Sequence, residues 1–451
     1  MKRAFTSISL ILLIAVAMFI GIFLARNDSP KDMENPHAYV GVAYCGNSVA
    51  QGKQMIDKVK GYTNLFVLQS GLLERDFSSV DELGDYAVAA GMFFLPYFGT
   101  FVQSSFSVWF ETAKQKWGTH LLGVYYADEP GGKMLDGNVE FKDAVTGDTI
   151  TKTTYGDIAV QKSDGVVINY QLGGTIHLYE PNGNSDMSEE TFYPNGTIQV
   201  LKPAETSFSF NSYQELLDIK PFTDLNDTAQ RFNAHDKNNI EFLKANSTKV
   251  FTSDYALYWF DYLSGYDVVL GQVGWNLTLN QQIALMRGAA DSQNKSWGII
   301  ITWKYQQPPY LANGSEILSQ ILTAYESGAK YFVLFDYYAD SDNSVYGTMT
   351  EDHFQALKSF WNDVVNNPKV VQGAIKADSV LVLPHNYGWG TRWDGDKIWG
   401  IFLSDAKTHQ IWDLMQTSLS EHDFNLDIVY YDTQYPMTRN YQNIYSVNDS
   451  R

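Results

Sequence analysis

Cysteine, histidine and basic residues are all scarce in this sequence, and each scarcity excludes a class of protein. The 451 residues include one cysteine, Cys45, which excludes both a framework of intramolecular disulfides and a zinc site built from several thiolates. Cys45 ends an apolar run and is expected in the core. The histidines His120, His177, His385 and His409 are scattered, without the spacing of metal ligands. We therefore expect neither a metal centre nor a cofactor.

Charged residues are few and mostly acidic. Lys and Arg number 32 against 51 Asp and Glu, which gives a formal net charge of −19. Such a surface repels phosphate backbones, so nucleic acid is not expected as a partner, whereas a neutral polar ligand is compatible with it. Charged residues make up only 18% of the chain and apolar residues 45%, which excludes wholesale disorder. Aromatic residues reach 15% and supply many flat apolar faces for ligand contact.

Residues 1–26 have the pattern of a membrane anchor. Lys2 and Arg3 precede an apolar stretch, residues 4–25, that contains no charge. About 20 such residues span a bilayer as a helix, whereas the apolar region of a cleaved signal peptide is usually about 7–15 residues long. We therefore expect an uncleaved single-pass anchor in the cell membrane, with the rest of the chain extracytoplasmic. A cleaved signal peptide is the alternative. Residues 27–37 are polar, contain two prolines and are expected to form a linker.

Glycosylation sequences favour export of the chain. Eight Asn-X-Ser/Thr sequences without proline at X begin at Asn27, Asn195, Asn226, Asn246, Asn276, Asn294, Asn313 and Asn448. An exported glycoprotein is the interpretation that we favour. The alternative is that a composition rich in Asn, Ser and Thr generates these sequences by chance.

Short apolar runs alternate with amphipathic segments through most of the chain. The expected strands are residues 39–44, 64–69, 92–98, 121–127, 249–252, 267–273, 298–303 and 331–335. The expected helices are residues 49–60, 80–90, 107–116, 228–245, 256–263, 279–291, 315–327 and 352–365. Eight strands, each followed by a helix, predict an α/β protein with a (β/α)₈ TIM barrel over residues 38–366. A doubly wound open sheet is the competitor, but it rarely needs eight such units in series.

Two segments depart from this alternation. Residues 136–210 carry Thr, Val, Ile and Tyr between Gly, Asn and Asp turns, which predicts an antiparallel β-rich insertion within the barrel. Because it follows the fourth strand, we expect the insertion to overhang the mouth of the barrel, where it would narrow the site or contact a polymer. Residues 374–451 predict a small C-terminal α/β domain, with strands at 379–383 and 426–430 and a helix at 408–421.

Active sites of such barrels lie at the C-terminal ends of the strands, and the fourth strand ends in two adjacent acids, Asp128 and Glu129. Cleavage of a glycosidic bond uses one carboxylic acid as proton donor and a second carboxylate. Adjacent residues of an extended strand point to opposite sides, so we expect Glu129 to take its partner from another strand. Asp254 and Asp336, which follow the fifth and eighth strands, are the candidates. The alternatives are a solvated turn for the first pair, and helix caps or salt bridges for the others.

Several aromatic and amide residues also stand at strand ends. Aromatic faces suit the C–H side of a sugar ring, and amides and amines suit its hydroxyl groups. A core role for any single aromatic, and a surface role for the lysine, are the alternatives. The predicted substrate-binding residues are Gln69, Tyr97, Tyr125, Gln272, Trp275, Trp303, Lys304 and Tyr338.

The sequence Leu-Leu-Gly-Val-Tyr-Tyr-Ala-Asp-Glu-Pro at 121–130 resembles the end of the fourth strand in TIM-barrel glycoside hydrolases. Residues 298–303 and 328–335 are similar to the seventh and eighth strands of that group, and the resemblance covers residues 38–366. It implies that Glu129 is the general acid. The seventh strand departs from the retaining pattern, because Trp303 and Lys304 stand where a nucleophilic glutamate is expected. The adjacent acids also depart from the chitinase-like pattern, in which one residue separates them.

The tail adds a second resemblance. Residues 383–392 and 396–400 resemble uncharacterised archaeal cell-surface proteins of this barrel type, which carry a flavodoxin-like or amidotransferase-like domain after the barrel. Two hypotheses follow. The first is a membrane-anchored extracytoplasmic glycoside hydrolase that acts on carbohydrate. The second is a non-catalytic glycan-binding or cell-envelope protein on a degenerate barrel, which would keep the aromatic residues but needs no pair of carboxylates.

Overall fold

The computed structural model describes residues 36–182, 186–202, 210–246, 248–275, 277–337 and 346–447. The predicted membrane anchor, residues 1–26, lies outside these ranges and stays a prediction. Within them, no helix combines the length and the apolar character needed to cross a bilayer.

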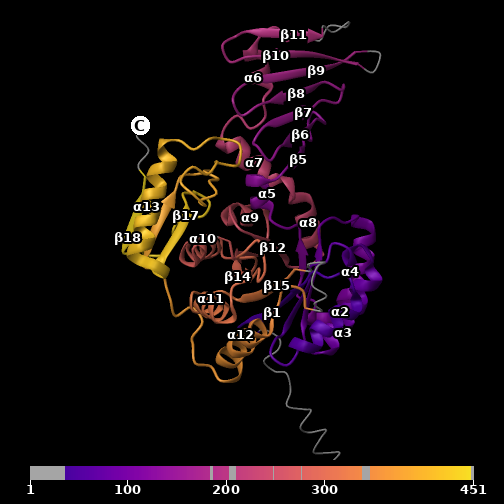
Figure 1. Ribbon diagram of the computed structural model, residues 1–451, viewed down its shortest axis with the longest axis vertical. Helices are drawn as coiled ribbons and strands as arrows, with labels where there is room; N and C mark the ends of the chain where they lie inside the picture. Colours follow the sequence, from indigo (N-terminus) through magenta and orange to yellow (C-terminus); the bar gives the residue numbers. More distant parts are fainter. Residues whose placement is uncertain are drawn as a thin grey trace, which may run out of the picture. The chain divides into compact units, whose positions relative to one another are not determined.

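Eight parallel strands close into a barrel in the order β1-β15-β14-β13-β12-β4-β3-β2. This confirms the predicted TIM barrel. Strands β1, β12, β14 and β15 of this barrel lie among the surrounding helices in Figure 1. Alternate residues of each strand face the barrel interior and the surrounding helices: in the eighth strand, Tyr331 and Val333 lie inside, and Phe332 and Leu334 lie outside. The strands are β1 (Tyr39–Tyr44), β2 (Leu65–Leu68), β3 (Phe93–Phe98), β4 (Val124–Tyr126), β12 (Val250–Asp254), β13 (Val268–Val273), β14 (Ser296–Ile301) and β15 (Tyr331–Asp336).

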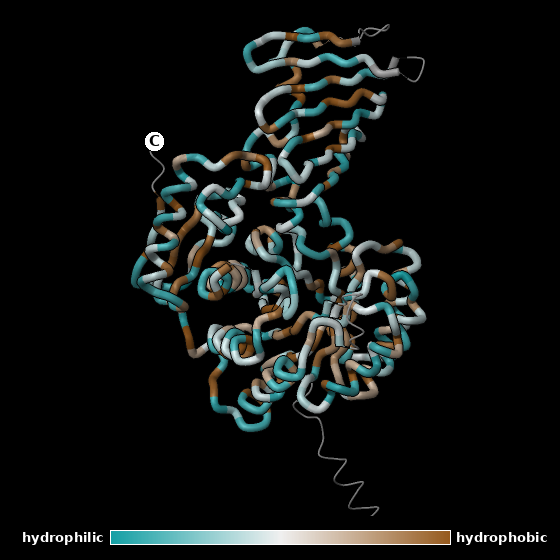
Figure 2. Tube along the Cα trace, viewed as in Figure 1, coloured by the Kyte–Doolittle hydropathy of each residue, from teal (hydrophilic) through white to brown (hydrophobic). Residues whose placement is uncertain are grey.

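Amphipathic helices surround the barrel and carry both hydrophobic and hydrophilic residues (Figure 2). The segment predicted as one helix over 228–245 forms parts of two helices, which are separated by Asp236. The carboxylate of Asp236 accepts a hydrogen bond from Tyr126 Oη at 3.0 Å. The helices are α2 (Val49–Val59), α3 (Phe77–Ala89), α4 (Gln103–Trp117), α5 (Pro130–Asp136), α6 (Tyr213–Ile219), α7 (Leu225–His235), α8 (Lys237–Ala245), α9 (Tyr258–Ser264), α10 (Leu279–Ser292), α11 (Gly314–Glu326) and α12 (Glu351–Trp361).

The insertion after β4 and α5 is a seven-stranded antiparallel sheet, as predicted, and its strands follow one another in chain order (Figure 1). Five of its described turns place a glycine in the left-handed region, and the first four of these glycines, at residues 147, 156, 165 and 174, are nine residues apart. The fifth is Gly196, in the turn between β10 and β11. The strands are β5 (Val139–Lys142), β6 (Thr149–Lys152), β7 (Ile158–Gln161), β8 (Val167–Tyr170), β9 (Ile176–Asn182), β10 (Asp186–Phe192) and β11 (Ile198–Lys202).

The C-terminal segment forms a three-stranded parallel sheet in the order β17-β16-β18. It consists of β16 (Ser379–Leu383), α13 (Ala406–His422), β17 (Leu426–Tyr430) and β18 (Asn443–Ser446). The sequence did not predict β18, because this strand is short and mostly exposed and lacks an apolar run. The sheet packs on α10 of the barrel, where Arg287 Nε donates to Asp427 Oδ1 at 2.7 Å and both side chains are buried.

Candidate active site

Asp128 and Glu129 line the same cavity at the C-terminal end of the barrel. The expectation that they point to opposite sides is therefore wrong. The chain is no longer extended where it leaves β4, because Ala127 (φ 52°) and Glu129 (φ 55°) are both in the left-handed region. Two left-handed residues around Asp128 turn both carboxyl groups toward one hollow, which an extended strand could not do.

Three donors surround the carboxylate of Asp128. Ser253 Oγ donates to Asp128 Oδ1 at 2.8 Å, and Gln69 Nε2 lies 3.3 Å from Asp128 Oδ2. Tyr125 Oη also donates to Asp128 Oδ1, and this tyrosine is fully buried. Tyr125 and Gln69, which we predicted to bind substrate, thus contact the acid. Their hydrogen bonds hold Asp128 as an acceptor in a fixed orientation.

Glu129 has a different environment. Gln272 Nε2 donates to Glu129 Oε1 at 2.6 Å and also lies 3.2 Å from Ser253 Oγ, so a chain of polar contacts links the two acids. Burial raises the pKa of Glu129, and the nearby charge of Asp128 raises it further, while the hydrogen bond from Gln272 lowers it. The net increase favours the protonated form, which is the form that can donate a proton.

The cavity that contains both acids, which we call the central cavity, has a volume of about 230 Å³. Trp275 and Trp303 form an aromatic wall, with ring centroids 6.5 Å apart and ring planes 28° apart. Tyr337 packs edge-on against Trp303 at 4.6 Å. The remaining lining residues in the described part of the chain are Gln69, Ser253, Gln272, Ile300, Thr302 and Phe335.

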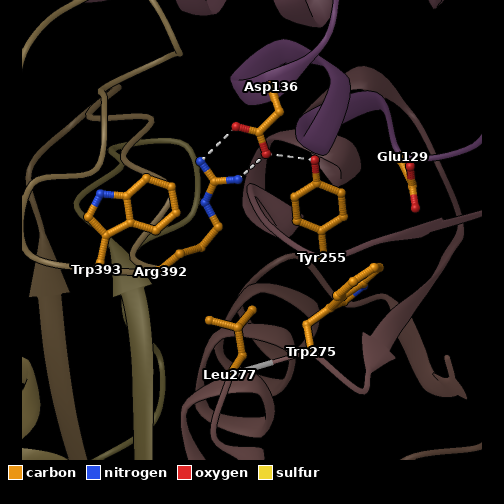
Figure 3. Close-up of a pocket in the computed structure, with 7 residues that line it drawn as sticks. All are labelled: Glu129, Asp136, Tyr255, Trp275, Leu277, Arg392 and Trp393. Atoms are coloured by element: carbon orange, nitrogen blue, oxygen red, sulfur yellow. Dashed lines mark hydrogen bonds and ion pairs between the residues drawn. The ribbon is translucent and has the colours of Figure 1, made fainter. Parts of the chain in front are cut away.

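A second cavity of about 470 Å³, the outer cavity, adjoins the first (Figure 3). Glu129 and Trp275 line both cavities, so the two meet at the acid. The other lining residues of the outer cavity are Asp136, Tyr255, Leu277, Arg392 and Trp393.

Asp254 lies outside both cavities. It is fully buried at the end of β12 and accepts hydrogen bonds from the backbone N–H groups of Gly131 (2.6 Å), Gly132 (2.9 Å), Tyr255 (2.7 Å) and Ala256 (3.2 Å). Two of these donors belong to the first turn of α5, which begins directly after Glu129. Asp254 therefore fixes the turn that positions Glu129. Its own carboxylate does not face either cavity.

Asp336 and Lys304 also lie away from the acids. Phe335 and Tyr337 line the central cavity, so the intervening Asp336 points to the outer side of the barrel, where burial raises its pKa. Lys304 Nζ forms an ion pair with Glu316 at 2.6 Å and lines neither cavity. The structure therefore brings together Asp128 and Glu129 but neither of the partners that we expected for Glu129 from other strands.

Some of the remaining predicted site residues line the central cavity and others do not. Gln69, Gln272, Trp275 and Trp303 line the central cavity. Tyr97 is half-buried and packs edge-on against Tyr125 at 5.1 Å, behind the cavity wall. Tyr338 lies outside the described residues and stays a prediction.

Sequence reasoning missed several lining residues for two reasons. Ser253 and Tyr337 follow the inward-facing Phe251 and Phe335 by two residues. Both strands are buried on both sides, so the sequence alone did not show which side faces inward. Arg392 and Trp393 come from the tail after the barrel, and no strand-end rule points to them.

The first residues of the predicted insertion lie near the site: Asp136 lines the outer cavity, and Val139 and Glu140 of β5 line a further cavity together with Asp128. Among the described residues of β6 to β11, none lines the central or the outer cavity, and a narrowing of the site by the insertion stays a prediction. Within the described ranges, no group of three or more His, Cys, Asp or Glu side chains is arranged to hold a metal ion.

A buried acid beneath the site gives a prediction about stability. Asp261 in α9 is 0% exposed, and burial together with the charge of Asp254 raises its pKa well above the usual value. A raised pKa in the folded state stabilises the protein below the pKa of the unfolded chain, and this contribution is lost as the pH rises through the folded-state value. We expect Asp261→Asn to match the wild type in melting temperature near pH 4 and to exceed it near pH 8.

Thermal unfolding across this pH range measures the effect, with the exposed Asp413→Asn in α13 as the matched control. Parallel pH curves for wild type and Asp261→Asn would show that the buried acid does not titrate with folding.

Comparison with known proteins does not place the chain in a family. No family model matches the sequence. No curated protein matches it either. Among solved structures, it is similar to a 3-hexulose-6-phosphate synthase (10% identity, TM-score 0.32, covering 72% of this chain and 98% of that chain). It is also similar to a D-psicose 3-epimerase in the presence of D-fructose (7% identity, TM-score 0.33, covering 74% of this chain and 100% of that chain). A third similar structure is that of a β-glycosidase (8% identity, TM-score 0.32, covering 73% of this chain and 96% of that chain). At these identities and TM-scores the similarities carry no information about the reaction of this chain.

Proposed function

We propose that this protein is a glycoside hydrolase in which Glu129 is the general acid and Asp128 is the second carboxylate. One observation carries the proposal: two adjacent acids turn into one aromatic-walled cavity at the C-terminal end of a TIM barrel. Paired carboxyl groups and flat apolar faces are what cleavage of a glycosidic bond requires.

The two acids take different roles because their surroundings differ. Glu129 is half-buried, and burial raises its pKa, which suits it to donate a proton to the glycosidic oxygen as the bond from that oxygen to C1 breaks. Asp128, held by Tyr125, Ser253 and Gln69, directs negative charge at the positive charge that develops on the sugar ring. One water supplies the oxygen that ends on C1, and a proton from that water restores Glu129.

A non-catalytic glycan-binding protein is the second candidate, and a specific observation favours it. Trp303 occupies the end of the seventh strand, where retaining enzymes place a glutamate, and Asp254 and Asp336 both face away from the cavity. Such a protein would bind glycans at the same aromatic wall without releasing sugars.

A screen of sugars released from a panel of disaccharides and oligosaccharides, in which the leaving group is another sugar, tests the proposal. The wild type is expected to release product from at least one substrate, and Glu129→Gln, which keeps the shape and removes the proton donor, is expected to release almost none. The control is Glu241→Gln on the exposed face of α8, which is expected to behave as wild type. Binding without release by the wild type would favour the second candidate. Equal activity of wild type and Glu129→Gln would exclude Glu129 as the acid.

The surroundings of Glu129 predict opposite pKa changes in two variants. Asp128→Asn removes a charge that raises the pKa of Glu129, so that pKa is expected to fall. Gln272→Leu removes a hydrogen bond that lowers it, so the pKa is expected to rise. Carbon-13 NMR titration of labelled glutamate measures both changes without requiring activity. Since protonated Glu129 is the active form, the alkaline limb of any measurable pH–rate profile should move in the same directions. Shifts of the same sign in both variants would contradict this account.

We also propose that the enzyme is held on the extracytoplasmic face of the cell membrane by residues 1–26. The supporting observation is the uncharged stretch 4–25 behind Lys2 and Arg3. Retention of the full chain in membranes after carbonate extraction is the expected result, and release of a shortened chain into the soluble fraction would indicate a cleaved signal peptide.

A further inference from the structure

The outer cavity meets the central cavity at Glu129 and is the larger of the two, but no role has yet been given to its other lining residues. Two separate regions of the chain build its walls: Tyr255, Trp275 and Leu277 follow barrel strands, and Arg392 and Trp393 belong to the segment between β16 and α13. Figure 3 shows Glu129 and Trp393 at opposite ends of this hollow, with Arg392 and Tyr255 between them.

Large apolar faces are exposed at this cavity. Trp275 is 45% exposed and Trp393 is 51% exposed, although both are large hydrophobic side chains. A flat indole face that remains open to solvent beside a cavity is suited to stacking against a sugar ring. Leu277 adds an apolar contact between the two ends.

The charge of the cavity selects against acidic ligands. Arg392 donates to Asp136 through both terminal nitrogens, and to Asp396 through Nε at 2.8 Å and Nη2 at 2.7 Å. Two carboxylates therefore neutralise one guanidinium, and Asp136 is further held by Tyr255 Oη at 2.9 Å. With no spare positive charge, the cavity suits a neutral ligand better than one that carries carboxylates or sulfates.

The position of the acids orients the substrate. Glu129 lines both cavities, so the glycosidic oxygen that it protonates lies where they meet. Of these two cavities, Asp128 lines the central one and not the outer one, so the sugar whose C1 becomes positive lies in the central cavity. The leaving part of the substrate must then extend into the outer cavity.

We propose that the outer cavity binds the leaving-group sugars of a neutral oligosaccharide, with Trp393 of the C-terminal segment as the stacking platform. This inference rests on the proposed function and gives it a substrate class: neutral chains rather than single sugars with a small leaving group. It also assigns a role to the tail. The same segment is fixed to the barrel through Arg392 and through Gln281 Nε2, which donates to the carbonyl oxygen of Thr391 at 2.6 Å.

Binding of a length series tests the inference. Neutral oligosaccharides of one to six units are titrated by calorimetry into Glu129→Gln, which binds without turnover. Affinity is expected to rise with length, and Trp393→Ala in the same background is expected to lose about 10-fold for the longer chains. The control is Leu403→Ala, at an exposed apolar residue in the same segment, which is expected to change nothing. An oligosaccharide of uronic acids is expected to bind more weakly than a neutral chain of the same length.

A second measurement separates this inference from the proposed function. In an otherwise wild-type chain, Trp393→Ala is expected to keep the hydrolysis rate of a nitrophenyl monosaccharide within about twofold while raising KM for oligosaccharides. If affinity rises with oligosaccharide length and this rise depends on Trp393, but the wild type hydrolyses no substrate, the proposed function would be wrong. The outer cavity would then still be a glycan-binding site. Affinity that does not depend on length, equal losses on short and long ligands, tighter binding of uronic acids, or no glycan binding would each overturn the inference.

Discussion

The substitution Glu129→Gln is expected to lower kcat by about 10²- to 10⁴-fold for substrates whose leaving group is another sugar. A sugar alkoxide is a poor leaving group and must be protonated as the C1–O bond breaks. Glu129 is the carboxyl group placed where the two cavities meet, and its burial favours the protonated form. Glutamine has nearly the same shape, but its amide cannot deliver a proton.

The leaving group provides an internal control for this prediction. A dinitrophenyl glycoside leaves as a stable anion and hardly needs an acid, so its kcat is expected to fall by less than about tenfold in Glu129→Gln. Steady-state rates on a matched pair of substrates measure both effects in one protein. Equal losses on the two substrates would show that Glu129 holds the site together or binds substrate and does not act as the acid.

The substitution Gly288→Ala is expected to destabilise the protein by about 3 kcal/mol. Gly288 lies in α10 at the contact with β17, and an added Cβ would come within 2.3 Å of the carbonyl oxygen of Ile428. Because the clashing atom belongs to the backbone, the helix and the strand must separate. That movement would also loosen the buried pair of Arg287 and Asp427, which are 2% and 0% exposed.

Chemical denaturation measures this effect, with Gly61→Ala as the control, because a Cβ at Gly61 meets no atom within 4 Å. The contact of α10 with β17 also positions the tail that carries Trp393. Gly288→Ala is therefore expected to weaken oligosaccharide binding more than it slows hydrolysis of a nitrophenyl monosaccharide. Unfolding at the same denaturant concentration as Gly61→Ala would show that the tail is not held through this contact.

The barrel could be predicted because its elements follow from local patterns. Residues 39–44 form an uninterrupted apolar run, and the structure places β1 at the same residues. Strand-end reasoning also found Glu129, Asp128, Gln272, Trp275 and Trp303, because parallel strands bring their C-terminal ends to one side.

Other parts of the site could not be predicted, and the reasons are geometrical. The left-handed residues Ala127 and Glu129 depend on the packing around α5, where Asp254 binds the helix backbone from the neighbouring strand. Strand alternation alone did not reveal which side of β15 faces the interior. For that reason the sequence offered Asp336 as a partner for Glu129, although it does not line the central cavity.

By itself, the sequence determined the order and type of the elements, the parallel barrel and the end of the barrel at which polar and aromatic groups gather, because hydrophobic periodicity is a local property of the chain. Only the tertiary structure decided that Asp128 and Glu129 share the central cavity and that Trp393 of the tail borders the adjoining outer cavity. Those two outcomes depend on backbone turns and on contacts between residues far apart in the chain, and neither leaves a periodic pattern in the sequence.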